Sequence, residues 1–277
     1  MNTVNIHVIS QHNVNYACGT KAIALAELLN LGISVPPFYV ISSTSFDDFI
    51  TERGIISPEA FFSTIEYDSR HLLQFEQVFL VSTSGEPVLD DKYMVRSSSV
   101  PLEKIDTGMF PSMISGVFES YYAGSALEAK QKIIEVWKSV YSKKAYNQCR
   151  FMSEQAFVKS IAVIIQKYIN SVVSGVAHTN QKGVSINWVE GHLLKIVNGE
   201  TLGNNIDAYI SETGDSILRG IEAEILKVNN SPLCKAIPLL LKQAQTIRGY
   251  YGCEQEIEWI YDGDAVWVVQ TQPLLLE

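Results

Sequence analysis

Two strand-like segments near the end of the chain place the strongest constraint on its fold. Residues 255–261 and 265–271 alternate polar and apolar side chains on either side of Asp262-Gly263-Asp264, a pattern typical of an antiparallel hairpin. Because side chains alternate between the two faces of a strand, Glu256 and Glu258 share one face and the apolar residues share the other. The fold must therefore bury one face of this hairpin and keep the carboxylates on the other.

The register of the hairpin decides which residues of the return strand lie opposite these carboxylates. A two-residue turn would mix polar with aromatic side chains across the strands, so we favour a three-residue loop. A loop that starts at Asp262 sets Glu256 opposite Gln270. A loop that starts one residue later sets Glu258 opposite Gln270, and it also sets Glu256 opposite Gln272. Either loop keeps the polar side chains on one face.

The composition limits the kind of protein that contains this hairpin. The chain has 277 residues, 47% of them apolar and 18% charged, which is enough to build one large domain or two lobes. Its formal charge is −9 without a basic block, which argues against a nucleic-acid partner or an anionic membrane. We recognise no leader segment and no apolar run of about 18 residues. The four cysteines are scattered, without C-x-x-C spacing. We therefore expect a soluble, cytoplasmic protein.

Apolar periodicity and turn residues predict a mixture of helices and strands. The expected helices cover residues 19–31, 44–53, 57–66, 126–149 and 232–250, and the expected strands outside the hairpin cover residues 38–41, 92–96, 117–122, 157–169, 172–179 and 184–189, with a loop at 100–115. Helices and strands alternate in the first part of the chain, and strands dominate the last part. The sequence therefore predicts an α+β fold of two lobes, with an N-terminal lobe of residues 1–155 and a C-terminal lobe of residues 156–277.

Two basic residues occur where an anion is able to bind. Lys21 lies in the first turn of a predicted helix, where the helix dipole opposes a cation but favours a bound anion. The Walker A pattern is absent, and a solvated surface lysine explains Lys21 equally simply. Arg96 ends a predicted strand beside a predicted turn of three serines, and its guanidinium is suited to bidentate binding of phosphate. Serine turns at strand ends are common, so the pattern by itself leaves both interpretations open.

Two further features have a functional and a purely structural explanation. Glu256 and Glu258 suit Mg²⁺, which prefers oxygen ligands and shares them with phosphates, although the wet face of an amphipathic strand explains them too. His178, in the strand that contains Gly175, is a candidate catalytic base, but a packed or surface histidine is the favoured interpretation. A glycine inside a strand often marks a close backbone approach.

Six short motifs follow one another along nearly the whole chain. They are Gly19-Thr20-Lys21-Ala22 with Leu25-Ala26-Glu27-Leu28 and Val35-Pro36-Pro37, then Val95-Arg96-Ser97-Ser98, Ser115-Gly116-Val117-Phe118-Glu119-Ser120, Ser174-Gly175-Val176-Ala177-His178-Thr179, Glu256-Ile257-Glu258-Trp259 and Gln270-Thr271-Gln272-Pro273. In this order they resemble the nucleotide-binding domain of the phosphoenolpyruvate synthase and pyruvate phosphate dikinase family, which rifampin phosphotransferase and glutamine kinase share. The family's motifs are G-G-K with L-x-E-L and V-P-P, V-R-S-S, F-A-G-Q-x-E-S/T, S-G-V-x-F-T, D-I-E-W and Q-x-R-P.

The resemblance implies an ATP-grasp-like fold with a nucleotide cleft between two lobes, and an ATP-dependent phosphotransferase (kinase) activity. By resemblance, Lys21 and Arg96 are catalytic and hold the phosphates of ATP. The residues that border the nucleotide base are Gln166, Tyr168 and Ile169. The residues that approach Mg²⁺ and the phosphates are Glu258 and Gln270, together with Glu256.

The chain departs from the family's motifs at several positions. Gln272 stands where the family usually has arginine, His178 where it has phenylalanine, and Ser99-Val100-Pro101 where many members have an acidic pair. We expect the phosphoryl acceptor to be a small molecule, or a histidine on a separate domain or partner protein. The alternative is a nucleotide-binding sensor or assembly subunit without catalysis, which the missing arginine favours.

Overall fold

The computed structural model describes most of the chain. The described residues are 4–5, 7–64, 66–68, 70, 83–84, 92–101, 117–151, 158–193, 201–210, 216–219 and 231–274. Most of the loop predicted at 100–115, and the first two residues of the motif at 115–120, lie outside these ranges. The chain divides into two compact units, one of residues 1–26 and 37–168 and the other of residues 27–36 and 169–277. Both units contain helices and strands, which confirms the predicted α+β class.

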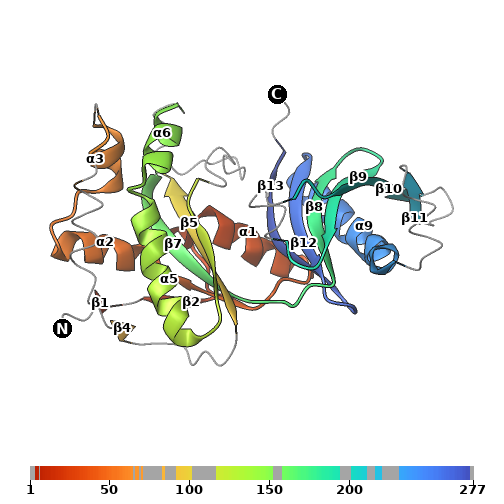
Figure 1. The fold of residues 1–277 in the computed structure, drawn as a ribbon, viewed down its shortest axis with the longest axis horizontal. Helices are drawn as coiled ribbons and strands as arrows, with labels where there is room; N and C mark the ends of the chain where they lie inside the picture. Colours follow the sequence, from red (N-terminus) through yellow and green to blue (C-terminus); the bar gives the residue numbers. More distant parts are fainter. Residues whose placement is uncertain are drawn as a thin grey trace. The chain divides into compact units, whose positions relative to one another are not determined.

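The first unit contains a five-stranded antiparallel sheet (Figure 1). In spatial order its strands are β2 (Val8–Ser10), β3 (Phe38–Ile41), β7 (Val158–Lys167), β5 (Tyr93–Pro101) and β6 (Ser120–Ala123). A separate parallel pair is formed by β1 (Val4–Asn5) and β4 (Thr83–Ser84). The helices of this unit are the 3-10 helix η1 (Tyr16–Cys18), the start of α1 (Gly19–Asn30), α2 (Ser43–Glu52), α3 (Pro58–Phe62), α5 (Ala126–Ser139) and α6 (Lys143–Phe151).

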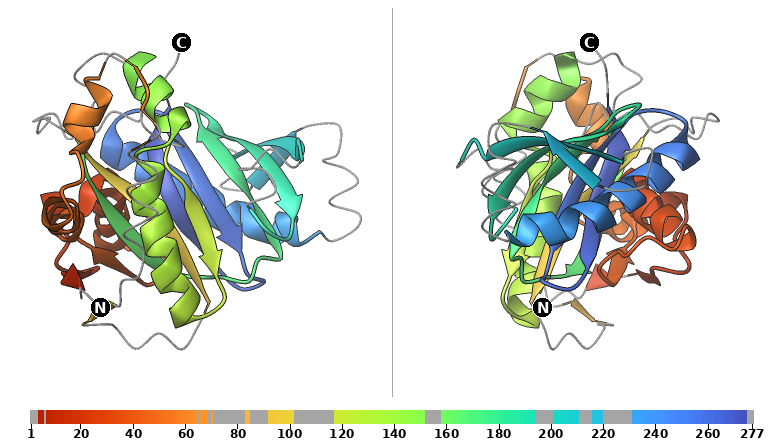
Figure 2. Two further views of the ribbon diagram at one scale, coloured as in Figure 1. Left: turned by 60° about the vertical axis from the view of Figure 1, so that its left-hand side comes forward. Right: turned by 90° about the vertical axis from the view of Figure 1, so that its right-hand side faces the viewer.

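One face of this sheet is buried by α2, α3 and α5 (Figures 1 and 2). The ring of Trp137 on α5 is fully buried and packs against Phe46 and Phe49 of α2, with centroid distances of 5.8 and 5.2 Å. Val95 of β5 and Ile165 of β7 belong to the same apolar cluster. Because side chains alternate along a strand, the neighbouring residues of β5 and β7 project from the other face of the sheet.

The helix predicted at 126–149 is interrupted. The structure has two helices there, α5 and α6, with a break at residues 140–142. Ser139 donates a hydrogen bond to the Val136 carbonyl, and the hydroxyl of Ser142 accepts one from the amide of Ala145, which starts a new helix. The break places Tyr141 in the core, where its hydroxyl donates to the Ile56 carbonyl at 2.7 Å.

The serines after Arg96 form a strand and not the predicted turn. Strand β5 continues through Ser97, Ser98 and Ser99 to Pro101, because each serine is paired with a residue of β7. Ser97 and Ser98 are both buried. Arg96 therefore lies inside a central strand and not at its end.

The second unit contains a six-stranded sheet covered by one long helix (Figures 1 and 2). The strands, in spatial order, are β11 (Ser216–Arg219), β10 (Asn204–Ile210), β9 (Gly183–Glu190), β8 (Val173–Thr179), β12 (Gln255–Tyr261) and β13 (Val266–Pro273). Helix α9 (Pro232–Tyr251) begins after Ser231, whose hydroxyl accepts from the Leu233 amide, and ends at Gly252 with φ of +67°. Trp259 of β12 is fully buried on the apolar side of the hairpin.

The hairpin combines a four-residue loop with a bulge. Tyr261 pairs with Val266, which leaves residues 262–265 in the loop, and the register shifts between Glu258 and Trp259. The shift sets Glu258 opposite Gln270 and Glu256 opposite Gln272. The predicted odd loop is therefore wrong, whereas the second of the two predicted pairings is correct. A bulge adds one residue to one strand, so it restores the pairing that an odd loop would give.

The unit boundary follows from strand pairing and differs from the predicted boundary after residue 155. Strand β7 pairs with β3 and β5, which keeps it in the first unit. Residues 27–36 belong to the second unit. There the Tyr251 hydroxyl donates to Glu27 at 2.7 Å, and the Val268 amide donates to the Ser34 carbonyl at 2.8 Å. In the part of the chain that the structure describes, no helix is long and apolar enough to cross a membrane.

Candidate functional site

In the first unit, the start of α1 is attached to strand β5. Gly19 has φ of +77° and ψ of 170°, and a Cβ atom there would lie 2.4 Å from the carbonyl oxygen of Ser98. The hydroxyl of Ser98 accepts a hydrogen bond from the amide of Ala22 at 3.2 Å. Only glycine allows this backbone approach without strain. The contact fixes the first turn of α1, which contains the half-buried Lys21, against the strand that contains Arg96.

Arg96 and Gln166 contact each other on the sheet face that carries Ser98. Arg96 is 8% exposed, and its Nη1 donates to Oε1 of Gln166 at 3.3 Å. Their strands are paired so that Met94 lies opposite Gln166, which makes Arg96 and Gln166 diagonal neighbours. The structure therefore brings together two of the predicted ligand-binding residues that are 70 positions apart in the sequence.

The amide nitrogen of Gln166 is buried. The side chain is 1% exposed, and its Nε2 has no acceptor among the described residues. A buried N–H group left unpaired costs about 1–3 kcal/mol. The site thus presents a fixed donor beside a guanidinium, and an acceptor-rich ligand such as a nucleotide fits both groups.

The two remaining residues of the predicted base-binding segment fall in different units. Tyr168 is half-buried in the first unit and contacts Tyr122 edge-on, with a centroid distance of 5.0 Å. Burial raises the pKa of its phenol, and the neighbouring Tyr122 adds to the effect. Ile169 belongs to the second unit, where it packs against a small cluster with Leu193, Ile260 and Val269.

In the second unit, three adjacent strands place a row of polar side chains on one face. Nε2 of His178 on β8 lies 3.1 Å from Oε2 of Glu256 on β12. On the other side, the Gln272 amide of β13 donates to Oε1 of Glu256 at 2.6 Å. Each oxygen of Glu256 therefore makes one hydrogen-bond contact and keeps a further lone pair that is able to bind a metal ion. Sequence reasoning did not identify the contact between His178 and Glu256.

Glu258 and Gln270 form the next cross-strand pair on the same face. Glu258 is half-buried and Gln270 is 6% exposed. Among the described residues, no group of three or more His, Cys, Asp or Glu side chains is arranged to hold a metal ion. One carboxylate with an amide oxygen nevertheless suits Mg²⁺, because this ion keeps several waters and uses few protein ligands beside substrate phosphates.

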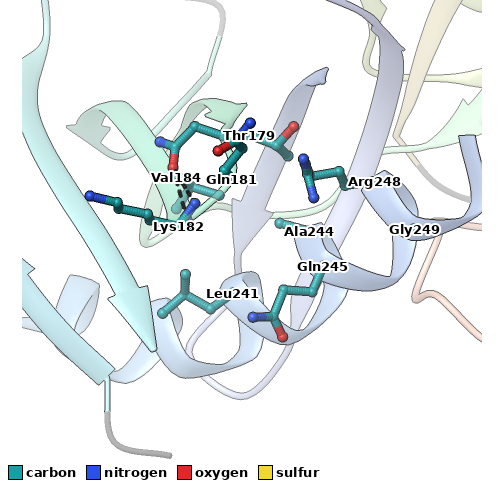
Figure 3. Close-up of a pocket in the computed structure, with 11 residues that line it drawn as sticks. Thr179, Gln181, Lys182, Val184, Leu241, Ala244, Gln245, Arg248 and Gly249 are labelled. Atoms are coloured by element: carbon teal, nitrogen blue, oxygen red, sulfur yellow. Dashed lines mark hydrogen bonds between the residues drawn. The ribbon is translucent and has the colours of Figure 1, made fainter. Parts of the chain in front are cut away.

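The opposite face of this sheet contains a small pocket beside α9 (Figure 3). It has a volume of about 140 Å³ and is lined by Thr179, Asn180, Gln181, Lys182, Gly183, Val184, Leu241, Ala244, Gln245, Arg248 and Gly249. Ligand pockets usually measure about 300 Å³ or more, and none of the predicted site residues lines this one. Arg248 and Thr179 both hydrogen-bond to Glu254. The hydrogen bond from the Arg248 guanidinium lowers the pKa of that carboxyl.

The first unit thus combines a buried guanidinium, an amide donor without a partner among the described residues, and a lysine in a nearby helix turn, within a mixed α+β fold. Groups of this kind suit phosphorylated ligands. The sequence pattern of the family described as "Pyruvate phosphate dikinase, AMP/ATP-binding domain" matches residues 69–276. The chain therefore belongs to that family.

Individual relatives agree with this assignment. A probable phosphoenolpyruvate synthase of Archaeoglobus fulgidus is 24% identical over 308 residues, which cover 92% of this chain and 39% of that protein. Rifampicin phosphotransferase of Bacillus cereus is 23% identical over 304 residues, which cover 94% of this chain and 34% of that protein. This chain thus spans less than half the length of these relatives. Among solved structures, an L-amino acid ligase of Bacillus licheniformis matches with a TM-score of 0.38 and 11% identity, over 92% of this chain and 42% of the ligase.

Proposed function

We propose that this chain binds Mg·ATP and transfers a phosphoryl group from it to an acceptor. The observation that carries the proposal is the buried pair of Arg96 and Gln166, in which a guanidinium stands beside an amide donor that has no described partner. The membership in a family of AMP/ATP-binding domains supports the choice of nucleotide. The relatives named as a synthase and a phosphotransferase support transfer as the reaction.

Each unit contributes one set of ligand-binding groups in this proposal. In the first unit, Lys21 and Arg96 bind the phosphates, and Gln166 donates to the nucleotide. Phosphoryl transfer depends mainly on positioning and on neutralising negative charge, which these groups supply. Tyr168 borders the base.

In the second unit, Glu258 and Gln270 bind Mg²⁺, and Ile169 offers an apolar surface to the base. When bound, the ion neutralises charge on the phosphates of ATP. We also propose a cytoplasmic location for the protein, because ATP is available there.

The competing proposal is a nucleotide-binding subunit without catalysis. The position of Gln272 favours it, because the neutral amide is engaged with Glu256 at 2.6 Å and adds no positive charge. Product analysis separates the two proposals. Transfer yields ADP or AMP together with a phosphorylated acceptor, whereas a sensor binds Mg·ATP without turnover.

Binding is tested by the melting temperature with and without Mg·ATP. A ligand at a hundred times its Kd stabilises the folded state by about 2.7 kcal/mol, which corresponds to roughly 5–10 °C for a domain of about 150–250 residues. We expect Gln166→Met to abolish most of this shift, since it removes the amide donor and keeps the size of the side chain. Lys92→Ala, an exposed position in the same unit, is the control and should keep the shift. An unchanged melting curve of the original protein at millimolar Mg·ATP refutes the proposal.

A further inference from the structure

The contact between His178 and Glu256 orients the imidazole ring. An ionised carboxylate only accepts hydrogen bonds, so Nε2 carries the hydrogen and donates it to Glu256 at 3.1 Å. In the neutral ring the other nitrogen, Nδ1, then holds the lone pair. Within the described part of the chain, the hydrogen bond to Glu256 is the only one made by the imidazole of His178. In its neutral form, the ring therefore presents Nδ1 as a nucleophilic nitrogen that makes no hydrogen bond to any described residue.

The strand pairing places His178 near the proposed metal-binding pair. His178 lies opposite Glu256, and Val176 lies opposite Glu258, so His178 and Glu258 are diagonal neighbours on one sheet face. Such neighbours are about 7–8 Å apart, within reach of long side chains. The side chain of His178 is 45% exposed, which leaves it open to a ligand. Phosphates held by a metal ion at Glu258 would thus lie within reach of the ring.

Gln272 completes the arrangement on the other side of Glu256. Its amide donates to Oε1, while His178 engages Oε2, so the carboxylate is fixed from both sides. Because glutamine is neutral, it orients Glu256 without cancelling its charge. The full negative charge of the carboxylate stays directed at the imidazole.

We propose that His178 is a phosphoryl acceptor of this chain, so that Mg·ATP phosphorylates the protein on Nδ1. This inference rests on the proposed function, because it requires bound Mg·ATP. The lone pair of Nδ1 forms a bond to the terminal phosphorus, the bond from that phosphorus to the bridging oxygen breaks, and ADP leaves with its electron pair. The Nε2 proton stays on the ring. The positive charge that the imidazole gains is stabilised by the facing carboxylate of Glu256, which acts as a positioning residue.

The test is to incubate the protein with Mg²⁺ and ATP labelled at the terminal phosphate. We expect one acid-labile, alkali-stable phosphoryl group on the tryptic peptide of residues 168–182, which contains a single histidine, His178. His178→Gln should lose this label. His7→Gln is the matched control, because His7 also faces a carboxylate, Asp48, at 3.5 Å and is 55% exposed, but it lies in the other unit. The control should keep the full label.

The role of Glu256 is tested by the kinetics of labelling. Glu256→Gln should slow labelling roughly a hundredfold, because the charge facing the imidazolium is lost. The melting temperature without nucleotide should stay nearly the same, a result that a general loss of structure would not give. If Mg·ATP raises the melting temperature but peptide 168–182 stays unlabelled, the inference about His178 is overturned and the proposed function stands. If Mg·ATP has no effect on melting, the proposed function is overturned, and this inference with it.

Discussion

Gly19→Ala tests the backbone approach that organises the proposed phosphate-binding end of the first unit. At φ of +77° and ψ of 170°, the backbone lies in a region that is essentially restricted to glycine and costs about 1–3 kcal/mol for other residues. The new Cβ would also lie 2.4 Å from the Ser98 carbonyl oxygen, so α1 or β5 must move. We therefore expect a loss of at least about 3 kcal/mol in the free energy of unfolding, near the upper end of single-residue effects.

Gly54→Ala is the matched control in the same unit. Gly54 also has positive φ, +63°, but no atom lies within 4 Å of its added Cβ. It should therefore lose only the backbone strain, about 1–2 kcal/mol. Urea unfolding followed by fluorescence measures both variants, and the melting shift with Mg·ATP measures binding. Equal destabilisation by the two substitutions, with an unchanged nucleotide shift in Gly19→Ala, would refute the argument that this approach builds the site.

Three further substitutions have defined outcomes. The Arg248 guanidinium lowers the pKa of Glu254 from its ordinary value of 4.5, so the ionised carboxyl stabilises the fold above that pH and the gain is lost as the pH falls below it. Glu254→Gln should therefore be less stable than the original protein near pH 7, with a difference that shrinks toward about pH 3 in urea unfolding. Burial raises the pKa of Glu27, which the hydrogen bond from Tyr251 only partly offsets, so Glu27→Gln should raise the free energy of unfolding at neutral pH and lose this gain in acid. A gain of equal size at every pH would contradict the explanation. Trp137→Ala empties a fully buried site between two phenylalanines and should cost about 3–5 kcal/mol in the same assay; a cost below about 1 kcal/mol would contradict the packing.

Elements with strong local signals were predictable from the sequence. The helix predicted at 232–250 matches α9, because apolar residues recur at helical spacing between Ser231 and Gly252. Strands β10 and β11 were missed. Strand β10 begins with Asn204 and Asn205, both exposed, and such residues are typical of turns and not of strands. Pairing with β9 forms this strand, and a single sequence contains no direct sign of that pairing.

Contacts between residues that are far apart in the sequence could not be predicted. The polar face of the hairpin was predictable from the alternation of polar and apolar residues. The cross-strand partner of Glu258 depended on a bulge, which no residue pattern in the sequence indicates. The contact of Glu256 with His178 depends on the register of β12 against β8, across 78 positions of the chain. The same holds for the amide of Gln166, which has no partner in the part of the chain that the structure describes, since the sequence gives the residue but not its surroundings.

The two departures from the family's motifs at positions 178 and 272 become connected in the structure. One lies on β8 and the other on β13, and both contact the single carboxylate of Glu256 on the strand between them. An arginine at position 272 would pair with Glu256 and weaken its hold on an imidazole, because a guanidinium binds both oxygens of a carboxylate. The neutral amide of Gln272 binds one oxygen and leaves the other, with its charge, to His178. A histidine at one position and a glutamine at the other are therefore physically consistent with each other.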